Sequence, residues 1–387
     1  MSGCPACGSR EVSAIYRIEG IPVQSCILLD SEAEARAFPR GDMELMFCDA
    51  CGLVFNAIFD LARVDYGAAT EESQHFSNTF NRFAARLIDD IAATYELSGR
   101  RTLEIGCGKG DFLIELARRT GTRATGIDPG FLPGRATAVE GDVAFVKAYF
   151  TPSSVAAPPD FIVCRHTLEH VPAVGDFMSD VREVLDGQDD GALFFETPDV
   201  ARVLVEGAFW DIYYEHCSYF TLGSHARLFR AAGLDVTRLH LDFDDQYIIQ
   251  HARVGGAGTP LAQEDDLAEL RRHAAAFPAH VARVRARWRD FVSERARAGK
   301  RVALWGGGSK AVAFLTTCRL DEEVAAVVDI NPHKQGKHLA GAGHRVCAPE
   351  ELVDAAPDTV IAMNAVYREE IAAQLAGLGL SAELVAL

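Results

Sequence analysis

The sequence predicts an α/β protein that contains two doubly wound sheets and a small N-terminal metal-binding domain. An apolar strand pattern at 102–105 leads through Gly-x-Gly-x-Gly into a helix pattern, and a similar strand before residue 306 leads into Gly-x-Gly-x-x-Ala. Two Cys-x-x-Cys-Gly turns precede both. At 387 residues the chain exceeds one ordinary core. We expect a metal-binding domain at 1–60, a central domain at 61–255, a helical connector at 256–298 and a Rossmann-like domain at 299–387.

The composition argues against several classes of partner. Apolar residues make up 49% of the chain and charged residues 24%, as in a globular protein. The net charge of −17 disfavours nucleic acid, whose phosphates need clustered lysine and arginine. No apolar run reaches the roughly 18 residues of a membrane span, and the N-terminus lacks a signal-peptide pattern. Because the cysteines suit a reducing compartment, we expect a cytoplasmic protein with neither a membrane nor a nucleic-acid partner.

The two cysteine pairs have the spacing of a metal site. Each Cys-x-x-Cys turn can direct two thiolates at one ion, so that Cys4, Cys7, Cys48 and Cys51 together supply a tetrahedral site. Four thiolates leave no open position for water, so we expect a structural Zn²⁺. Redox chemistry at one pair is the alternative, which the duplication of the motif disfavours.

The central domain alternates between helix and strand patterns. A helix with apolar residues every four positions is expected at 83–95, after Tyr66 and a polar stretch that could line the mouth of the site. Ser224 is expected to cap the last helix of this domain. We expect strands at 102–105, 124–127, 143–146, 160–164 and 191–196, and an edge hairpin at 234–240 and 246–253.

The C-terminal third begins with a helical segment at 262–298, which Pro278 is expected to split or kink. The second sheet follows, and its second strand ends in Asp329, as in a dinucleotide site, so NAD binding is one alternative. The next loop is polar and basic, which suits a phosphate-bearing substrate. The residues expected to contact such a substrate here are Lys310, His333, Lys334 and Lys337.

The turn after residue 105 has the features of a cofactor site. Its three glycines let the backbone approach a ligand closely, and the helix N-terminus favours a carboxylate or phosphate. An acid at the end of the next strand can bind both ribose hydroxyls. These features predict an adenosine-containing cofactor, with an unliganded glycine-rich turn as the alternative. The expected contacts are Glu104, Gly106, Cys107, Gly108, Gly110, Asp128, Pro129, Arg165 and His166.

Two polar clusters follow this turn. The first, at 165–170, comes directly after a strand, at the edge where an open sheet binds ligands. Its histidines, His166 and His170, lie four residues apart, which leaves a metal pair and a structural role as alternatives. The second, at 213–220, combines a glutamate, a histidine and three tyrosines. A base beside a carboxylate and phenols suits deprotonation of carbon, so His216 is the candidate base, with a packed structural histidine as the alternative.

The whole chain resembles the deoxysugar C-methyltransferases of antibiotic biosynthesis. The resemblance rests on the cysteine pairs, on Glu104-x-Gly-x-Gly-x-Gly110, on the block at 213–219 and on Asn331-Pro-His-Lys-Gln-Gly336. It implies a zinc-binding N-terminal domain, a class I methyltransferase domain that binds S-adenosyl-L-methionine (SAM), and a C-terminal Rossmann-like domain. In that family the small-molecule substrate, a dTDP-4-keto-deoxyhexose, lies between the last two domains.

The resemblance also implies roles for individual residues. His216 matches the base that removes the proton next to the ketone, and Tyr213, Glu215, His170 and Tyr66 match residues beside it. We expect Glu215 and the tyrosines to orient or tune His216, and Tyr214 and Tyr219 to contact the substrate.

The sequence therefore predicts a SAM-dependent C-methyltransferase. Residues 306–310 read Gly-Gly-Gly-Ser-Lys where the family usually has Gly-Ala-Pro-Ala-Lys, which leaves another carbonyl compound as an alternative acceptor. Methylation of oxygen or nitrogen is a second alternative, in which His216 deprotonates a hydroxyl. A non-catalytic protein that binds SAM or a nucleotide sugar is a third.

Overall fold

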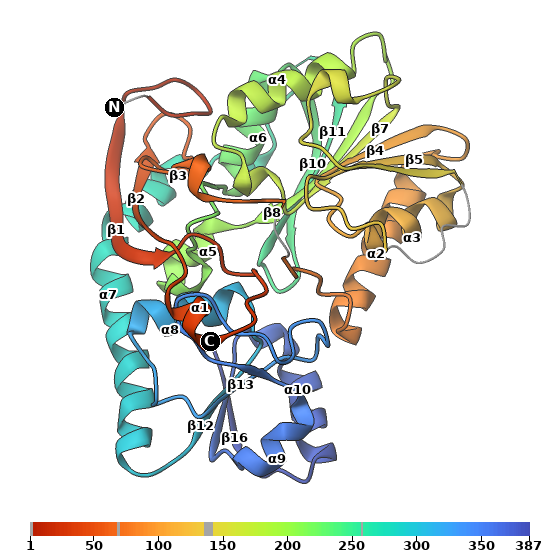
Figure 1. Cartoon of the computed structure of the whole chain (residues 1–387). Coiled ribbons are helices and arrows are strands. Elements are labelled where there is room, and N and C mark those ends of the chain that lie inside the picture. Colours follow the sequence, from red (N-terminus) through yellow and green to blue (C-terminus); the bar gives the residue numbers. More distant parts are fainter. Residues whose placement is uncertain (1–2, 68–69, 135–141, 257) are drawn as a thin grey trace.

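The computed structural model describes residues 3–67, 70–134, 142–256 and 258–387, and these form three β-sheets with helices between them (Figure 1). The N-terminal sheet has the order β1-β2-β3-β9 and is antiparallel. Its strand β9 comes from the middle of the chain, so this sheet is completed by the segment that carries His216. The elements are β1 (Val12–Pro22), α1 (Glu32–Arg36), β2 (Arg40–Cys48), β3 (Val54–Asn56) and β9 (Ser218–Tyr219).

The central sheet has seven strands in the order β10-β11-β8-β7-β4-β5-β6. Strands β4 to β8 are parallel, and the β10–β11 hairpin runs antiparallel along one edge. The order reverses between β4 and β7, which is where an open α/β sheet forms its ligand crevice. Its strands are β4 (Arg101–Ile105), β5 (Arg123–Ile127), β6 (Val143–Val146), β7 (Phe161–Arg165), β8 (Ala192–Pro198), β10 (Leu234–Asp242) and β11 (Tyr247–Val254).

The helix expected at 83–95 is present, and it begins earlier, at Asn78. The helices of the central part are α2 (Asn78–Thr94), α3 (Asp111–Thr120), α4 (Val174–Val184), α5 (Val200–Glu206) and α6 (Leu222–Ala231). One predicted cap is wrong. Thr221 is the N-cap of α6, and Ser224 lies three residues inside the helix, where its hydroxyl accepts from the Thr221 N–H at 2.8 Å. The two residues form a reciprocal capping box, and Ser224 does not begin the helix.

The C-terminal sheet has the order β14-β13-β12-β15-β16 and is parallel. The strand order reverses in this sheet too, between β12 and β15. Its elements are β12 (Val302–Trp305), α8 (Ser309–Cys318), β13 (Ala326–Val328), β14 (Val346–Cys347), α9 (Leu352–Ala355), β15 (Thr359–Ala362), α10 (Arg368–Gly377) and β16 (Glu383–Ala386).

Helix α7 (Leu267–Arg297) connects the central and C-terminal sheets and packs against β1, α5, α8 and β12 (Figure 1). Of the two expectations for Pro278, the split is wrong, because α7 is one helix with the proline inside it. Its buried residues continue on both sides of the proline, from Phe277 to Val281 and Trp288. Proline removes one backbone hydrogen bond, and the packing of this face outweighs that loss.

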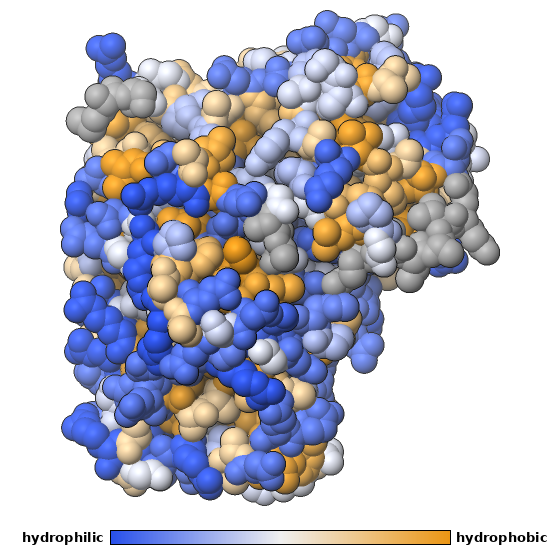
Figure 2. Space-filling model, viewed as in Figure 1, coloured by the Kyte–Doolittle hydropathy of each residue, from blue (hydrophilic) through white to orange (hydrophobic). Residues whose placement is uncertain are grey.

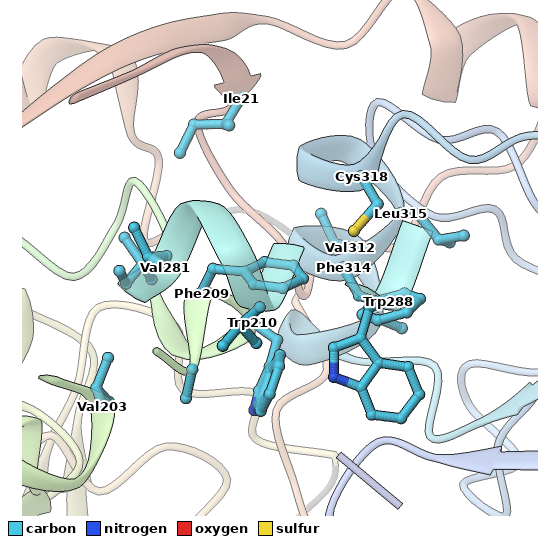
Figure 3. Close-up of a cluster of buried hydrophobic side chains, with 14 of the residues drawn as sticks. Ile21, Val203, Phe209, Trp210, Val281, Trp288, Val312, Phe314, Leu315 and Cys318 are labelled. Carbon is cyan, nitrogen blue, oxygen red and sulfur yellow. The ribbon is translucent and has the colours of Figure 1, made fainter. Parts of the chain in front are cut away.

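One hydrophobic core joins the N-terminal sheet to the C-terminal sheet. Phe209 and Phe314 stack with their ring centroids 5.9 Å apart, and Trp288 of α7 meets the edge of Phe314 at 5.8 Å (Figure 3). Ile21 of β1 belongs to the same core. The N-terminal and C-terminal segments are therefore packed into one body around α7.

No helix in the described part of the chain is long and apolar enough to cross a membrane. On the face shown in Figure 2, hydrophilic side chains predominate and the apolar ones lie in scattered groups.

Candidate active site

A cavity of about 730 Å³ opens at the carboxyl ends of the central strands, and residues of the N-terminal and C-terminal segments also line it. This volume is in the range of small-molecule sites. The predicted site residues that line the cavity are Tyr66, Glu104, Gly106, Cys107, Gly108, Asp128, Pro129, Arg165, His166, His170, Tyr213, Glu215, His216, Tyr219, Lys310 and Lys334.

The glycine-rich turn after β4 holds the backbone open to a ligand. Gly106 has a φ of 72°, and a Cβ atom there would come within 1.9 Å of the Thr167 hydroxyl oxygen. Gly110 is different, because it does not line the cavity. It has a φ of 88° at the N-cap of α3, and a Cβ there would lie 2.6 Å from the Phe145 ring. Gly110 therefore shapes the backbone at the start of α3, and it does not make the cofactor contact that was expected of it.

Two buried polar atoms beside this turn have no partner among the described residues. One is an Oε2 of Glu104, which is 2% exposed, and the other is an Nη2 of Arg165. Burial raises the pKa of Glu104 to about 8, although Arg165 lowers it. Arg165 is fixed by Glu196 at 2.7 Å and by the Phe112 ring, 4.0 Å from its guanidinium carbon. An unpaired acceptor and an unpaired donor suit the ammonium and carboxylate groups of an amino acid.

Asp128 follows β5, as predicted, and its carboxylate braces the glycine-rich turn. One oxygen accepts from the Gly108 N–H at 2.9 Å and the other from the Gly130 N–H at 2.6 Å. Burial raises the pKa of Asp128, although these two hydrogen bonds lower it. Each oxygen keeps a second lone pair for a hydroxyl group of a ligand.

His166 and His170 do not form the metal pair that their spacing allowed. His166 has a φ of 47°, and its Nε2 lies 2.8 Å from Glu196. Burial would lower the pKa of His166, but Glu196 and Glu169 raise it to about 9. His170 points elsewhere, with its Nδ1 3.0 Å from the Glu215 carbonyl oxygen and 3.2 Å from the Tyr66 hydroxyl. The chain leaves helical geometry at His166, so the two rings separate.

His216 lies in the cavity among aromatic rings. Its ring centroid is 4.5 Å from that of Tyr213 and 4.7 Å from that of His170, and both rings meet it edge-on. The hydrogen bonds of the described residues leave the His216 ring without a partner. Burial lowers the pKa of His216 well below its ordinary value, and the charges on His170 and His166 lower it further. The ring is therefore neutral at pH 7 and can accept a proton.

The prediction that Glu215 orients His216 is wrong in its geometry. One Glu215 oxygen accepts from the Ser25 N–H at 3.0 Å and also from the Ser25 hydroxyl. That hydroxyl lies 2.7 Å from the Ser309 hydroxyl. The other oxygen, Oε2, is buried without a partner. Burial raises the pKa of Glu215, although the Ser25 hydroxyl lowers it. The N-terminal, central and C-terminal segments therefore meet at this carboxyl group.

The four thiols of the N-terminal segment converge as their spacing predicted. We call Cys4, Cys7, Cys48 and Cys51 the four-cysteine cluster; its sulfur atoms all lie within 4.8 Å of one another. The Sγ atoms of Cys4 and Cys51 are 3.6 Å apart, as are those of Cys7 and Cys48. A tetrahedral zinc ion with bonds of about 2.3 Å needs sulfur atoms about 3.8 Å apart, so this arrangement fits the ion closely.

Comparison with known proteins agrees with this geometry. A methyltransferase domain model matches residues 74–239, and a model described as the C-methyltransferase C-terminal domain matches residues 241–382. The C-methyltransferase NovU of Streptomyces niveus is 28% identical over 397 residues, with 95% of this chain and 90% of NovU covered. The chain is a methyltransferase, and it resembles the C-methyltransferases over nearly its whole length.

Other relatives match a smaller part of this methyltransferase. The ubiquinone biosynthesis O-methyltransferase of Salmonella paratyphi A is 29% identical over 108 residues, which covers 26% of this chain and 43% of the relative. The magnesium protoporphyrin IX methyltransferase of Synechocystis PCC 6803 aligns with a TM-score of 0.37 at 16% identity, covering 46% of this chain and 84% of that structure. The family models and the central sheet together identify a class I SAM-dependent methyltransferase fold.

Three residues expected to contact the substrate lie outside the cavity of this methyltransferase. Tyr214 is only 1% exposed, packs in the core and accepts a hydrogen bond from the Asp60 N–H at 3.1 Å. Lys337 pairs with Asp30 at 2.5 Å, and His333 is exposed beside the Phe76 ring. Tyr213 lines the cavity, whereas Tyr214, the next residue, lies in a turn and packs into the core.

Asp211 is a residue of the site that no sequence pattern indicated. Its carboxylate joins three side chains at the bottom of the cavity. It accepts from the Tyr213 hydroxyl at 3.0 Å, and it pairs with Arg202 at 2.5 Å and with Lys310 at 2.6 Å. Lys310 thus reaches from α8 to the carboxylate that also accepts from Tyr213, whose ring lies beside His216. Gln24 and Cys26 of the N-terminal segment also line the cavity. No motif marks Asp211, because its partner Lys310 is distant in the sequence.

Proposed function

We propose that this methyltransferase removes a proton from a carbon next to a carbonyl group and methylates that carbon, with a nucleotide-linked 4-keto deoxysugar as acceptor. The observation that carries the proposal is the His216 ring, which is neutral, faces the cavity and has no hydrogen-bond partner among the described residues. A carbon acid needs a base of this kind, because carbon becomes a nucleophile only after a C–H bond is lost.

The residues of the glycine-rich turn fit SAM. The unpaired Glu104 oxygen and the unpaired Arg165 nitrogen suit the two charges of its amino-acid end, and Asp128 suits its ribose. Gly106 leaves room where any side chain would strike Thr167. When bound, SAM supplies an electrophilic methyl group. The chain supplies the orientation, since these contacts all come from the ends of β4, β5 and β7.

His216 performs the proton transfer. Its free ring nitrogen takes the proton from the carbon next to the carbonyl, and the electron pair of the broken C–H bond moves onto the carbonyl oxygen as an enolate. With SAM bound, the enolate carbon would bond to the methyl group as the sulfur–methyl bond breaks with its electron pair on sulfur, and the carbonyl would re-form. A neutral ring without a competing hydrogen bond is needed for the first step.

Glu215 stabilises the enolate oxygen. Its Oε1 already receives two donors from Ser25, so the proton of the neutral acid belongs on Oε2, the oxygen without a partner. Burial favours this neutral form, and a neutral carboxylic acid in the cavity can donate a hydrogen bond to a developing oxyanion.

The C-terminal sheet supports a nucleotide-linked acceptor. The cavity continues from His216 to Ser309, Lys310 and Lys334 at the edge of this sheet. Lys334 lies 3.3 Å from Asp329 and is mostly buried, so a cation is held at the place where a phosphate group would bind. An acceptor with a phosphate handle would therefore span both sheets.

The four-cysteine cluster holds a structural Zn²⁺ in this proposal. All four thiolates of a tetrahedral site come from the chain, so the ion has no position for substrate or water. Its effect is to fix the N-terminal sheet, whose strand β1 leads into the segment that places Ser25 against Glu215.

The test combines product formation with the fate of the proton. The enzyme is given SAM and a panel of nucleotide-linked 4-keto deoxysugars deuterated next to the ketone, and mass spectrometry follows methylation and loss of deuterium. His216→Asn should lower turnover about 100-fold or more, as for loss of a general base. The control His273→Asn changes a histidine of α7 outside the cavity and should leave turnover unchanged. Methylation with retention of the deuterium would show transfer to oxygen or nitrogen, and near-normal turnover of His216→Asn would refute the base.

A further inference from the structure

Glu169, His170 and His216 form a second cluster of metal-ligating side chains, which we call the cavity triad. One ligand atom from each residue lies within 4.8 Å of the others, and all three residues line the cavity. They come from segments separated in the chain and are joined by the Cys217 N–H, which donates to the Glu169 carbonyl oxygen at 2.9 Å. The backbone therefore holds the two halves of the triad in register.

The triad has lone pairs that the protein does not use. Oε1 of Glu169 faces Nδ1 of His166 at 3.6 Å, whereas Oε2 is buried and has no partner among the described residues. Glu169 as a whole is 2% exposed. Nδ1 of His170 points at the Glu215 carbonyl oxygen, which can only accept, so Nδ1 carries the proton and Nε2 keeps its lone pair. The His216 ring is also without a partner.

A histidine whose second nitrogen donates to a backbone carbonyl is the usual form of a metal ligand, because that hydrogen bond fixes the ring and its tautomer. A buried carboxylate oxygen without a partner is costly unless something binds it. Two imidazoles and one carboxylate suit a borderline divalent cation, and the open side toward the cavity leaves positions for water. The set differs from the four-cysteine cluster, which offers only sulfur.

We infer that the cavity triad is a second metal site, which binds Zn²⁺, Co²⁺ or Ni²⁺ and inhibits the enzyme when it is occupied. The cation would bond to the same His216 lone pair that accepts the proton. One ring nitrogen cannot do both, so the metal-bound enzyme cannot deprotonate its substrate. The inhibition rests on the proposed role of His216, whereas the binding of the cation rests on the triad alone.

The experiment measures binding and turnover separately on the full-length enzyme. Its metal content is determined as purified, and CoCl₂ is then added while the visible absorption of Co²⁺ is recorded. We expect additional Co²⁺ to bind with d–d bands but without the thiolate charge-transfer absorption of a sulfur site. Glu169→Gln, His170→Asn and His216→Asn should each remove this signal, and circular dichroism checks that each variant is folded. The matched control is His75→Asn, which changes a cavity histidine outside the triad and should keep the signal.

The outcomes are distinct. If no such signal is found, or if only His75→Asn removes it, the cavity triad is not a metal site. If the signal follows the triad, turnover measured over the same titration should fall as the site fills, by about 100-fold at saturation. A filled triad with full turnover would overturn the inhibition and the role of His216 as base, while leaving the metal site in place.

Discussion

Replacing Asp211 by Asn tests how strongly the central and C-terminal sheets are joined beneath the cavity. The Asp211 carboxylate pairs with Lys310 at 2.6 Å and with Arg202 at 2.5 Å, and it accepts from the Tyr213 hydroxyl at 3.0 Å. The side chains of Asp211, Arg202 and Lys310 are only 12%, 17% and 21% exposed. These charges are therefore poorly hydrated, and the loss of the carboxylate charge should lower the free energy of unfolding.

The size of the effect follows from what each partner keeps. Arg202 retains Glu206 at 2.7 Å, and the Asn side chain retains an oxygen for the Tyr213 hydroxyl. Lys310 is left with the Gln246 amide oxygen at 3.4 Å, so it becomes a buried cation without a carboxylate. Breaking a buried pair in this way costs about 3–5 kcal/mol, and we expect about 3 kcal/mol because only one cation is stranded.

Urea denaturation of the wild type and the variant measures this difference. The matched control is Asp321→Asn, which breaks another carboxylate–arginine pair between distant segments, with Arg36 at 2.9 Å. Those side chains are 45% and 53% exposed, so the control should lose at most about 1 kcal/mol. Adding Lys310→Met to Asp211→Asn removes the stranded cation and should restore part of the stability.

The reasoning would be refuted if Asp211→Asn and Asp321→Asn cost the same. The dependence of stability on acid pH independently checks that the Asp211 carboxylate stabilises the fold. Burial would raise the pKa of Asp211, but Lys310 and Arg202 lower it below its ordinary value. A lowered folded-state pKa means that the stabilisation is present above the unfolded pKa of about 3.9 and is lost as the pH falls through the folded one. Asp211→Asn should therefore flatten the acid limb of stability against pH.

Three further predictions concern the cofactor, the base and the metal. Gly106→Ala should abolish SAM binding in calorimetry, because the new Cβ atom would strike Thr167. The control Gly99→Ala has a φ of 70° and no atom within 4 Å of its Cβ, so it should bind SAM normally. Equal affinities of the two variants would contradict the close approach of SAM to Gly106. The acid limb of kcat/KM should lie below the ordinary histidine pKa of about 6.5, because burial lowers the pKa of His216, and an apparent pKa at or above that ordinary value would exclude this ring as the free base. Removal of zinc from the four-cysteine cluster should lower turnover far more than SAM affinity, with recovery when one equivalent of zinc refills that cluster and leaves the cavity triad empty; unchanged turnover in zinc-free protein would contradict the proposal.

Local patterns predicted the sheets and the cofactor turn well. Strand β4 and Gly106 were identified because apolar residues bounded by glycine give a short buried strand at a tight turn, and both signals lie within a few residues. The cysteine pairs were predictable for the same reason. The expectation that Pro278 could split the helix was wrong because it used local propensity alone. The packing of α7 on both sides of the proline outweighs that propensity.

The acceptor half of the site was harder to predict, because its contacts join distant segments. Ser25, Glu215 and Ser309 meet at one carboxyl group, and no pattern within any one segment indicates this. The block at 213–219 is polar and aromatic throughout, but only part of it lines the cavity, and Tyr214 packs in the core. Composition alone therefore could not separate Tyr213 from Tyr214.

The strand pairing between the four-cysteine cluster and His216 explains why loss of zinc should affect turnover. The cluster includes Cys48 at the end of β2, and β2 pairs through β3 with β9, which begins two residues after His216. The Asn56 N–H also donates to the Cys217 carbonyl oxygen at 2.9 Å. The glycine-rich turn belongs to a different sheet. Loss of zinc should therefore displace the base and leave the cofactor turn intact, so turnover and SAM affinity should separate.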